Sequence, residues 1–427
     1  MRILVRAITL SIALCVTIAG GTVIWRLTSI SPEPTLETVR ALLDAHDTVA
    51  AVETLARIPR LDIDNAATGA ILDELYGNIR DPATDEPAVH FANGSTRRIA
   101  RQLLEATQAR PKTDMARDRR AGEFALAAGL NDEAVDMLRR ARSADTASAP
   151  VLTPLAIALF RSGLFAEVLT VARPEEGTTA HQRCVLWALR GRAHEGLKQY
   201  DDARLSLRAA FVEEPANLRV IFRLGLVELA HGYRGEARAL LDRARGAAPG
   251  ATPTLRLAAE YAYVTGDYTA SAGDYGKLIG RNDTENYDPL PASLGKARAL
   301  IYAGDVRAAE IALGAAGALL PHDDFVQYYR ALLAYRSGDY RQAIELAQPL
   351  EARMKAYPPL NLLIGAASLA DGYPQIAARQ LLRYLDVESS NSAARALLNA
   401  AEDRIRNPGK QPRVPSELLL RAFSFPL

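Results

Sequence analysis

The chain has 427 residues, of which 49% are hydrophobic and 24% charged, with 51 Lys and Arg side chains against 50 Asp and Glu. The net charge of +1 argues against a general nucleic-acid binder, and the hydrophobic fraction is too high for a disordered chain. Two cysteines, Cys15 and Cys184, are too few for a disulfide scaffold or a cysteine-built zinc domain, and the length suits about three domains or one long repeat array.

An uncharged apolar segment lies close to the N-terminus, over residues 7–25. A helix of that length measures about 28 Å, close to the hydrocarbon core of a bilayer at ~30 Å. The sequence therefore predicts a transmembrane helix over 7–25 after a short cytoplasmic N-terminus over 1–6. Arg2 and Arg6 precede the segment and Arg26 follows it, which favours a single-pass inner-membrane protein whose C-terminal part is periplasmic.

A cleaved signal peptide is the alternative interpretation of this segment. Its charged start and apolar centre fit, and Thr17-Ile18-Ala19 offers a small-residue cleavage site. A lipoprotein is disfavoured, because Leu14 precedes Cys15 where a small residue is expected. Anchor and signal peptide both predict an extracytoplasmic chain.

An N-terminal helical region is expected over residues 35–112. Apolar residues recur with helical period on both sides of a polar break at 44–47, which predicts a helical hairpin. Further helices are expected at 64–79 and 97–108. Residues 82–95 contain two prolines and an Asn-Gly pair, which is typical of a loop.

Glycine and alanine then recur at intervals of 34 residues. The recurring sets are Gly191, Gly225 and Ala259, then Gly304, Gly338 and Gly372, and Ala309, Ala343 and Ala377. From Gly266 to Gly304 the step is 38, which indicates four inserted residues near 282–289. Eight units are placed at 115–148, 149–183, 184–217, 218–251, 252–289, 290–323, 324–357 and 358–391.

Each unit is expected to be a pair of helices, as residues 184–216 illustrate. Gly191 on the first helix and Ala203 on the second allow a close approach, and Leu207 fills the space beside them. Pro215 ends the second helix, because proline lacks the donor that would continue it.

These residues resemble the tetratricopeptide repeat (TPR) family, whose 34-residue pattern places Trp, Leu, Gly, Tyr, Ala, Phe, Ala and Pro at set positions. The matching residues are Trp187, Gly191, Ala203, Ala210 and Pro215, then Leu224, Gly225, Gly232, Ala237, Ala244 and Pro249, and later Gly365, Gly372, Ala377 and Leu381. Lys198 replaces the turn glycine of its unit. The resemblance implies an all-α, right-handed superhelical solenoid of about eight repeats over 115–391, a capping helix over 392–406 and a C-terminal tail over 407–427.

The sequence contains no recognisable catalytic, cofactor-binding or metal-binding motif, so a non-enzymatic protein is expected. The six histidines have no metal-ligand spacing; they are His46, His90, His181, His194, His231 and His322. Cys184 opens a predicted helix, where packing is the expected role. No glycine-rich phosphate loop occurs, because the glycines after the apolar segment follow the repeat register.

In the TPR family, the first helices of the hairpins line a concave groove. Its groove-facing positions correspond here to Arg192, Arg219, Arg223, Arg256, Glu260, Tyr263, Arg298, Tyr328, Tyr329 and Tyr335. Arginine binds carboxylates in a bidentate manner and tyrosine offers a large contact area, so an acidic peptide segment is the expected ligand. The Lys and Asn residues of the family's peptide-carboxylate clamp are absent.

The apolar segment and the resemblance together imply a membrane-anchored scaffold that binds protein partners. The resemblance implies a cell-envelope assembly, such as polysaccharide synthesis and export, cytochrome maturation or pilus assembly. The alternative hypothesis is a periplasmic module that binds glycan or an acidic polymer directly. Neither hypothesis requires a cofactor, and neither involves nucleic acid.

Overall fold

The computed structural model describes residues 34–88, 91–110, 112–144, 149–279, 292–320, 322–355 and 357–408. These residues form α-helices, two 3₁₀ turns (Pro174–Glu176 and Gln348–Leu350) and one isolated antiparallel bridge between Arg80 and Pro87. The predicted all-α chain of helical hairpins is confirmed over this part of the sequence.

The predicted transmembrane helix at 7–25 lies outside the described residues, as do the predicted insertion at 282–289 and nearly all of the tail at 407–427. Within the ranges that the structure describes, no helix combines the length and the apolar character needed to span a membrane.

The chain divides into two compact units. The first contains the helices α2 (Leu36–Asp44), α3 (Thr48–Arg57), α4 (Ala66–Ile79), α5 (Gly94–Gln108), α6 (Met115–Ala127) and α7 (Asn131–Ala144). Leu55, Leu72 and Phe124 are fully buried in this unit, and α6 packs against both α4 and α5. The predicted N-terminal region and the first predicted repeat therefore share one compact unit, with no unit boundary at residues 112–115.

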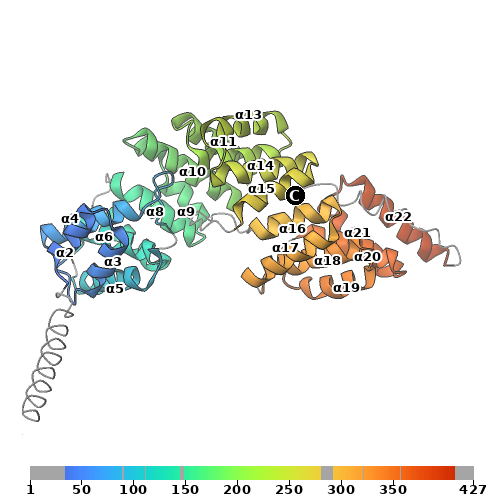
Figure 1. The fold of residues 1–427 in the computed structure, drawn as a ribbon, viewed down its shortest axis with the longest axis horizontal. Helices are drawn as coiled ribbons and strands as arrows, with labels where there is room; N and C mark the ends of the chain where they lie inside the picture. Colours follow the sequence, from blue (N-terminus) through green and yellow to red (C-terminus); the bar gives the residue numbers. More distant parts are fainter. Residues whose placement is uncertain are drawn as a thin grey trace, which may run out of the picture. The chain divides into compact units, whose positions relative to one another are not determined.

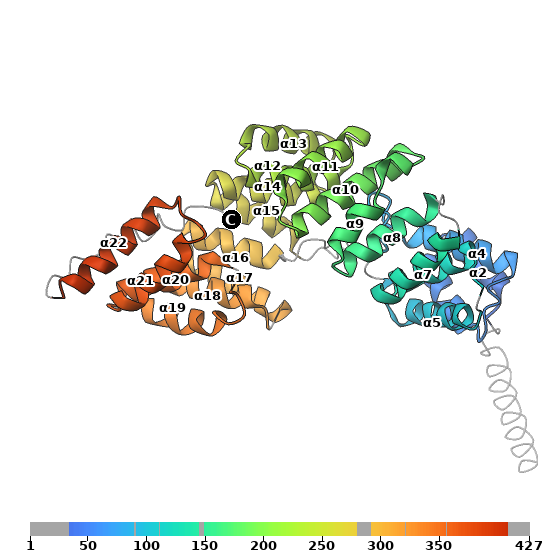
Figure 2. The same cartoon turned by 180° about the vertical axis from the view of Figure 1, so that it is seen from behind.

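The second unit consists of Pro82–Asp85 and the chain from Leu159 onward. The boundary between the two units, after Ala158, falls within α8 (Ala149–Arg161). Its helices pair in chain order (Figure 1, and from behind in Figure 2). They are α9 (Phe165–Val171), α10 (Ala180–Gly196), α11 (Tyr200–Glu213), α12 (Leu218–Ala230), α13 (Arg234–Ala247), α14 (Thr252–Thr265), α15 (Tyr268–Leu278), α16 (Ala292–Ala303), α17 (Val306–Leu319), α18 (Asp324–Arg336), α19 (Tyr340–Ala347), α20 (Pro358–Ala370), α21 (Pro374–Leu385) and α22 (Ser392–Arg406).

Glycine in the left-handed conformation ends the first helix of most hairpins. Gly266 has φ 87°, and the backbone N–H of the next residue, Asp267, bonds to the carbonyl of Ala262 at 2.8 Å. The Asp267 side chain then accepts from the N–H of Ala270 and caps α15. Lys198 adopts φ 60° at the equivalent place, so this hairpin turns without glycine. Glycine is the residue that adopts this conformation without steric cost, which explains its 34-residue recurrence.

A second small-residue position lets the paired helices touch. A Cβ added to Gly191 would lie 2.7 Å from Cγ of Leu207 and 3.3 Å from the carbonyl oxygen of Ala203. The same relation to a leucine 16 residues later recurs in two other hairpins, at Gly122 with Leu138 and at Gly365 with Leu381. The close approach predicted for Gly191, Ala203 and Leu207 is therefore confirmed.

Candidate functional site

The ten predicted groove residues all lie on the first helices of hairpins, on α10, α12, α14, α16 and α18. They separate into two groups by burial. Arg192, Arg219 and Arg223 are half-buried. The other seven are at most 7% exposed; they are Arg256, Glu260, Tyr263, Arg298, Tyr328, Tyr329 and Tyr335. These seven side chains are therefore packed inside the structure rather than open to solvent, and their predicted contact with a partner stays a prediction.

Arg192, Arg219 and Arg223 form what we call the arginine cluster, on the consecutive first helices α10 and α12. The Arg192 guanidinium lies 4.0 Å from the centre of the Phe160 ring, a cation–π distance. The Arg219 backbone N–H donates to the capping side chain of Asn217 at 3.1 Å, so Arg219 belongs to the first turn of α12. The cluster therefore brings three guanidinium groups together on two neighbouring first helices.

Glu195 adds a carboxyl group to the arginine cluster. Burial raises the pKa of Glu195, and the nearby guanidinium groups of Arg223 and Arg192 offset that rise only in part. A buried carboxyl with a raised pKa holds its charge less firmly than an exposed one. Glu195 therefore lies close to two of the three guanidinium groups of the cluster.

A buried ionic group lies further along the second unit, formed by Glu260 of α14, Tyr275 of α15 and Arg298 of α16. Arg298 Nη2 donates to Glu260 Oε1 at 2.6 Å, and the Tyr275 hydroxyl donates to the same oxygen. The Arg298 guanidinium also lies 4.1 Å from the centre of the Tyr263 ring. Burial alone would lower the pKa of Arg298, but the Glu260 carboxylate and the surrounding tyrosine hydroxyls together outweigh it, so the pKa is raised. These residues hold adjacent hairpins together through a desolvated ion pair.

The predicted tyrosine-rich surface is a packed aromatic cluster in the structure. Tyr263 and Tyr302 meet edge to face with ring centres 5.4 Å apart, and Tyr328 contacts Tyr329 at 5.2 Å and Tyr357 at 5.1 Å. Burial raises the pKa of Tyr302 to about 12. Rings from successive hairpins fill the space between helices, and contact of these residues with a partner stays a prediction.

Sequence reasoning missed Glu195 of the arginine cluster, Tyr275 of the buried ionic group and Tyr357 of the aromatic cluster. Glu195 follows Arg192 by three residues, a spacing that places both on one helical face and would have signalled a pair. Tyr275 gave no such signal, because it lies on the second helix of its hairpin and meets Glu260 only through folding.

A separate polar cluster surrounds His181, at the start of α10. His181 Nδ1 lies 2.9 Å from Glu214 Oε1, and Nε2 lies 3.5 Å from Asp85 Oδ1. Asn217 Nδ2 donates to the Ala83 carbonyl at 3.0 Å and to Glu214 at 2.9 Å. This cluster fastens the segment Pro82–Asp85 to α10 and to the α11–α12 junction.

The histidine of this cluster is expected to be charged at neutral pH. Hydrogen bonding to Asp85, together with Glu214, raises the pKa of His181 from 6.5 to about 9 against the opposing effect of burial. Among the described residues, no group of three or more His, Cys, Asp or Glu side chains has an arrangement that would hold a metal ion.

We expect His181 to stabilise the second unit in a pH-dependent manner. Because its folded-state pKa is raised, the stabilisation is complete below pH 6.5 and is lost as the pH rises through about 9. The free energy of unfolding of the parent protein should exceed that of His181→Gln at pH 6, and the two should converge above pH 9. Urea denaturation across this range measures the difference.

The matched control is His322→Gln, which makes the same change at an exposed histidine. The free energy of unfolding of His322→Gln should differ from that of the parent protein by a small amount that does not change with pH. A His181→Gln difference that is equally flat would contradict the proposed ion pairs.

Cys184 packs in the interior beneath the same cluster. It is 1% exposed, and its Sγ lies 3.9 Å from Asn217 Nδ2. Burial raises the pKa of the thiol, with the Glu214 and Glu213 carboxylates acting in the same direction. The thiolate that nucleophilic chemistry requires is disfavoured here.

The sequence matches no protein-family model and no curated protein. Its fold is similar to that of a tetratricopeptide repeat protein from Parabacteroides merdae, with 15% identity over 71% of this chain and 98% of that one and a TM-score of 0.43. It is also similar to the APC/C hetero-tetramer Cut9–Hcn1 (10% identity, 85% and 82% of the chains, TM-score 0.49) and to PilW, a type IV pilus biogenesis factor (15% identity, 50% and 98%, TM-score 0.41). These similarities concern the fold only, and the repeats of this chain are defined by its own hairpins and their register.

Proposed function

We propose that this chain of TPR-type hairpins is a non-enzymatic scaffold that binds a protein partner through the arginine cluster. The observation that carries the proposal is the half-buried placement of Arg192, Arg219 and Arg223 on consecutive first helices. Partly buried guanidinium groups lose less hydration on binding than exposed ones, and their hydrogen bonds to carboxylates are worth about 1.5–3 kcal/mol each. The partner is therefore an acidic peptide segment.

The scaffold is proposed to act at a membrane. Residues 7–25 have the length and composition of a membrane-spanning helix, and the arginines that flank them favour a periplasmic location for the hairpins. A tether of this kind raises the local concentration of the scaffold around membrane-bound machinery. We propose a role in a cell-envelope assembly, with polysaccharide synthesis or export as the leading example.

The experiment that tests partner binding is crosslinking in native membranes. Arg192→Ser, Arg219→Ser and Arg223→Ser combined should reduce the captured partner at least tenfold, because a loss of about 1.4 kcal/mol in total already corresponds to that factor. Quantitative mass spectrometry of the captured proteins measures the change.

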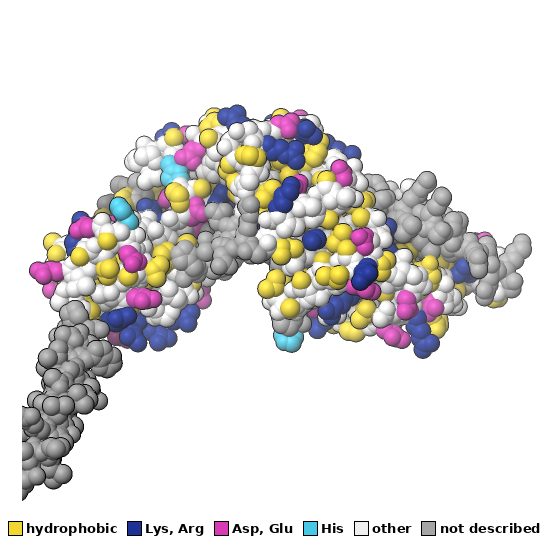
Figure 3. Space-filling model, viewed as in Figure 1, with side chains coloured by type: hydrophobic (Ala, Val, Ile, Leu, Met, Phe, Trp, Pro, Cys, Tyr) yellow, Lys and Arg dark blue, Asp and Glu magenta, His cyan; other side chains and the backbone are white. Residues whose placement is uncertain are grey.

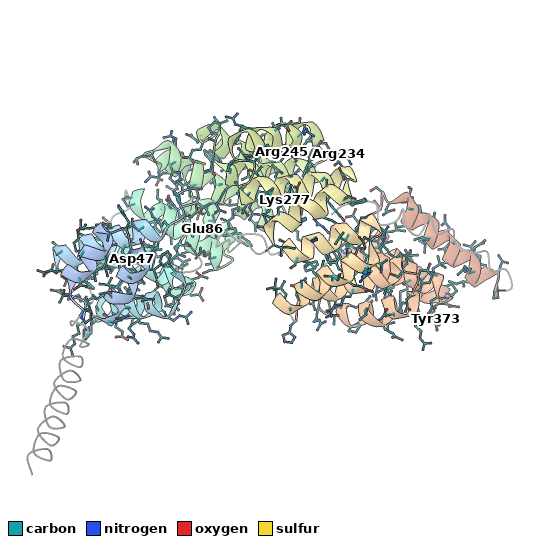
Figure 4. All side chains as sticks on the ribbon, in the orientation of Figure 1. Asp47, Glu86, Arg234, Arg245, Lys277 and Tyr373 are labelled. Carbon is teal, nitrogen blue, oxygen red and sulfur yellow. The ribbon has the colours of Figure 1, made fainter. Side chains whose placement is uncertain are left out.

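The control makes the same three-arginine change on α13, at Arg234, Arg238 and Arg245. These side chains are exposed on a second helix; Arg234 and Arg245 are labelled in Figure 4. Capture should equal that of the parent protein in this control. Undiminished capture by the arginine-cluster variant would disprove the proposed site.

The alternative function, direct glycan binding, has less support from the structure. Its expected stacking residues Tyr328, Tyr329 and Tyr335 are at most 7% exposed, so they do not present ring faces to solvent. Retention of the parent protein on immobilised envelope polysaccharide without any protein partner would favour this alternative.

A further inference from the structure

A row of unpaired arginines follows the outer face of α5, in the first unit. Arg97, Arg98 and Arg101 are exposed, and none of their guanidinium groups forms a hydrogen bond or an ion pair with a described residue. Figure 3 shows Lys and Arg side chains gathered along this side of the first unit. No motif of the repeat register accounts for them.

The C-terminal end of α3 enlarges this basic surface. Gln102 Nε2 of α5 donates to the carbonyl of Ile58 at 3.1 Å, which holds the end of α3 beside α5. Two exposed arginines, Arg57 and Arg60, flank Ile58. We call the combined surface the α5 patch; it consists of Arg57, Arg60, Arg97, Arg98 and Arg101.

Few carboxylates oppose the α5 patch. Glu53 lies 3.9 Å from Arg57, the limit of an ion pair, and both side chains are more than half exposed. Glu105, one turn after Arg101, is exposed as well. The patch therefore presents an excess of positive charge to solvent.

The local energetics of α5 do not favour this arrangement. Arg97 and Arg101 are like charges at i,i+4, a pairing that destabilises an isolated helix. The first turn of α5 contains no acidic residue, and cations close to a helix N-terminus oppose the macrodipole. A bound anion would offset both costs, which indicates that the patch serves binding rather than stability.

We propose that the α5 patch binds the anionic lipid headgroups of the membrane that holds the anchor. This inference rests on the membrane anchor of the proposed function. Eight residues lie between Arg26 and Thr35, the N-cap of α2, and the nine steps from one to the other, at no more than ~3.6 Å each, reach about 32 Å. The first unit therefore begins within a short distance of the bilayer.

The chemistry of the patch fits phosphate groups on a surface. Guanidinium groups bind phosphate oxygens with two parallel hydrogen bonds, and each arginine close to an anionic bilayer adds to the attraction. The attraction extends over a Debye length of about 8–10 Å at ordinary salt. Several arginines on one helical face can therefore hold α5 against the headgroups once the tether has brought them close.

Energy transfer from α5 to the bilayer surface tests the proposal in the full-length protein. A donor dye is attached at Gln108→Cys, an exposed α5 position outside the patch, with Cys15 and Cys184 replaced by Ala. The vesicles carry acceptor-labelled headgroups and contain either phosphatidylcholine alone or an equimolar mixture with phosphatidylglycerol. Transfer should be clearly higher in the anionic vesicles and should fall to the neutral level in about 1 M salt, where the Debye length is ~3 Å.

Replacing Arg97, Arg98 and Arg101 with Gln should abolish this difference between the two lipids. The thermal stability of the triple variant should equal or slightly exceed that of the parent, because a like-charge pair is removed. The matched control, Arg234→Gln, Arg238→Gln and Arg245→Gln on α13, should keep the full difference. Equal transfer in both lipids, or a difference that survives the α5 substitutions, would overturn the proposal.

The anchor is assessed separately in the same samples. A chain that sediments with phosphatidylcholine vesicles and resists alkaline extraction has an inserted anchor. If the chain does not sediment with the phosphatidylcholine vesicles, the prediction of a membrane anchor is wrong. The α5 patch is then tested by sedimentation with the anionic vesicles alone. Retention there that depends on Arg97, Arg98 and Arg101 supports the α5 patch, and its absence rejects it.

Discussion

Replacing Arg298 with Met is expected to lower the free energy of unfolding of the second unit by about 3–5 kcal/mol. Arg298 is 5% exposed and Glu260 is 7% exposed, and their 2.6 Å contact is the main compensation for burying both charges. Methionine fills similar space but leaves the Glu260 carboxylate buried with only the Tyr275 hydroxyl. An uncompensated buried charge is among the most costly changes that a single substitution can make.

Urea denaturation followed by circular dichroism measures this loss, with the exposed α17 residue Arg307 as the matched control. Arg307→Met should change the free energy of unfolding by no more than about 0.5 kcal/mol. The double variant Arg298→Met with Glu260→Met should recover much of the loss, and the resulting double-mutant cycle isolates the pair energy. If Arg298→Met lowers the free energy of unfolding by less than about 1 kcal/mol, the Arg298 and Glu260 charges are not buried away from water in the way that the structure shows.

Replacing Gly191 with Leu is expected to destabilise the α10–α11 hairpin by about 1–3 kcal/mol, and by more if the helices are forced apart. Even the first added carbon would lie 2.7 Å from Leu207 Cγ and 3.3 Å from the Ala203 carbonyl oxygen. The leucine side chain can rotate, but the backbone oxygen of α11 cannot move without displacing the helix. Hydrogen exchange of α10 and α11 amides, together with urea denaturation, measures the effect.

Gly314→Ala serves as the comparison, because it adds a carbon at a glycine inside α17 where no heavy atom lies within 4 Å apart from the adjacent residues and the backbone of the helix itself. It should stabilise the protein by about 0.5–1 kcal/mol, since glycine is a poor helix former. The two substitutions should therefore have opposite signs. A neutral Gly191→Leu would mean that the hairpin tolerates a wider separation than its packing indicates.

The helices and their register could be predicted because their signals are local. A helix follows from apolar residues three and four positions apart, and a turn follows from glycine at a position that needs positive φ. Gly266 and Gly372 illustrate the second signal, with φ of 87° and 90°. The packing of Gly191 against Leu207 was also predictable, because the pair repeats with the 34-residue unit.

The composition of the candidate site could be predicted only in part. The repeat register identified the helices and positions that carry Arg192, Arg219 and Arg223, but it also assigned buried tyrosines such as Tyr328 to an exposed surface. A groove position is open or filled according to the size of side chains on neighbouring hairpins. A pattern within one unit contains no information about those neighbours.

The sequence by itself determined that this protein is a series of helical hairpins with small residues where paired helices touch. Only the tertiary structure decided which polar groups lose water and which partners they gain. Glu260 and Arg298 are 38 residues apart and meet across two hairpins, and His181 meets Asp85 from a distant loop. The physical reason is the distance along the chain over which each interaction acts. Backbone conformation and helical periodicity are set within a few residues, whereas burial and ion pairing depend on side chains that folding brings together from far apart in the chain.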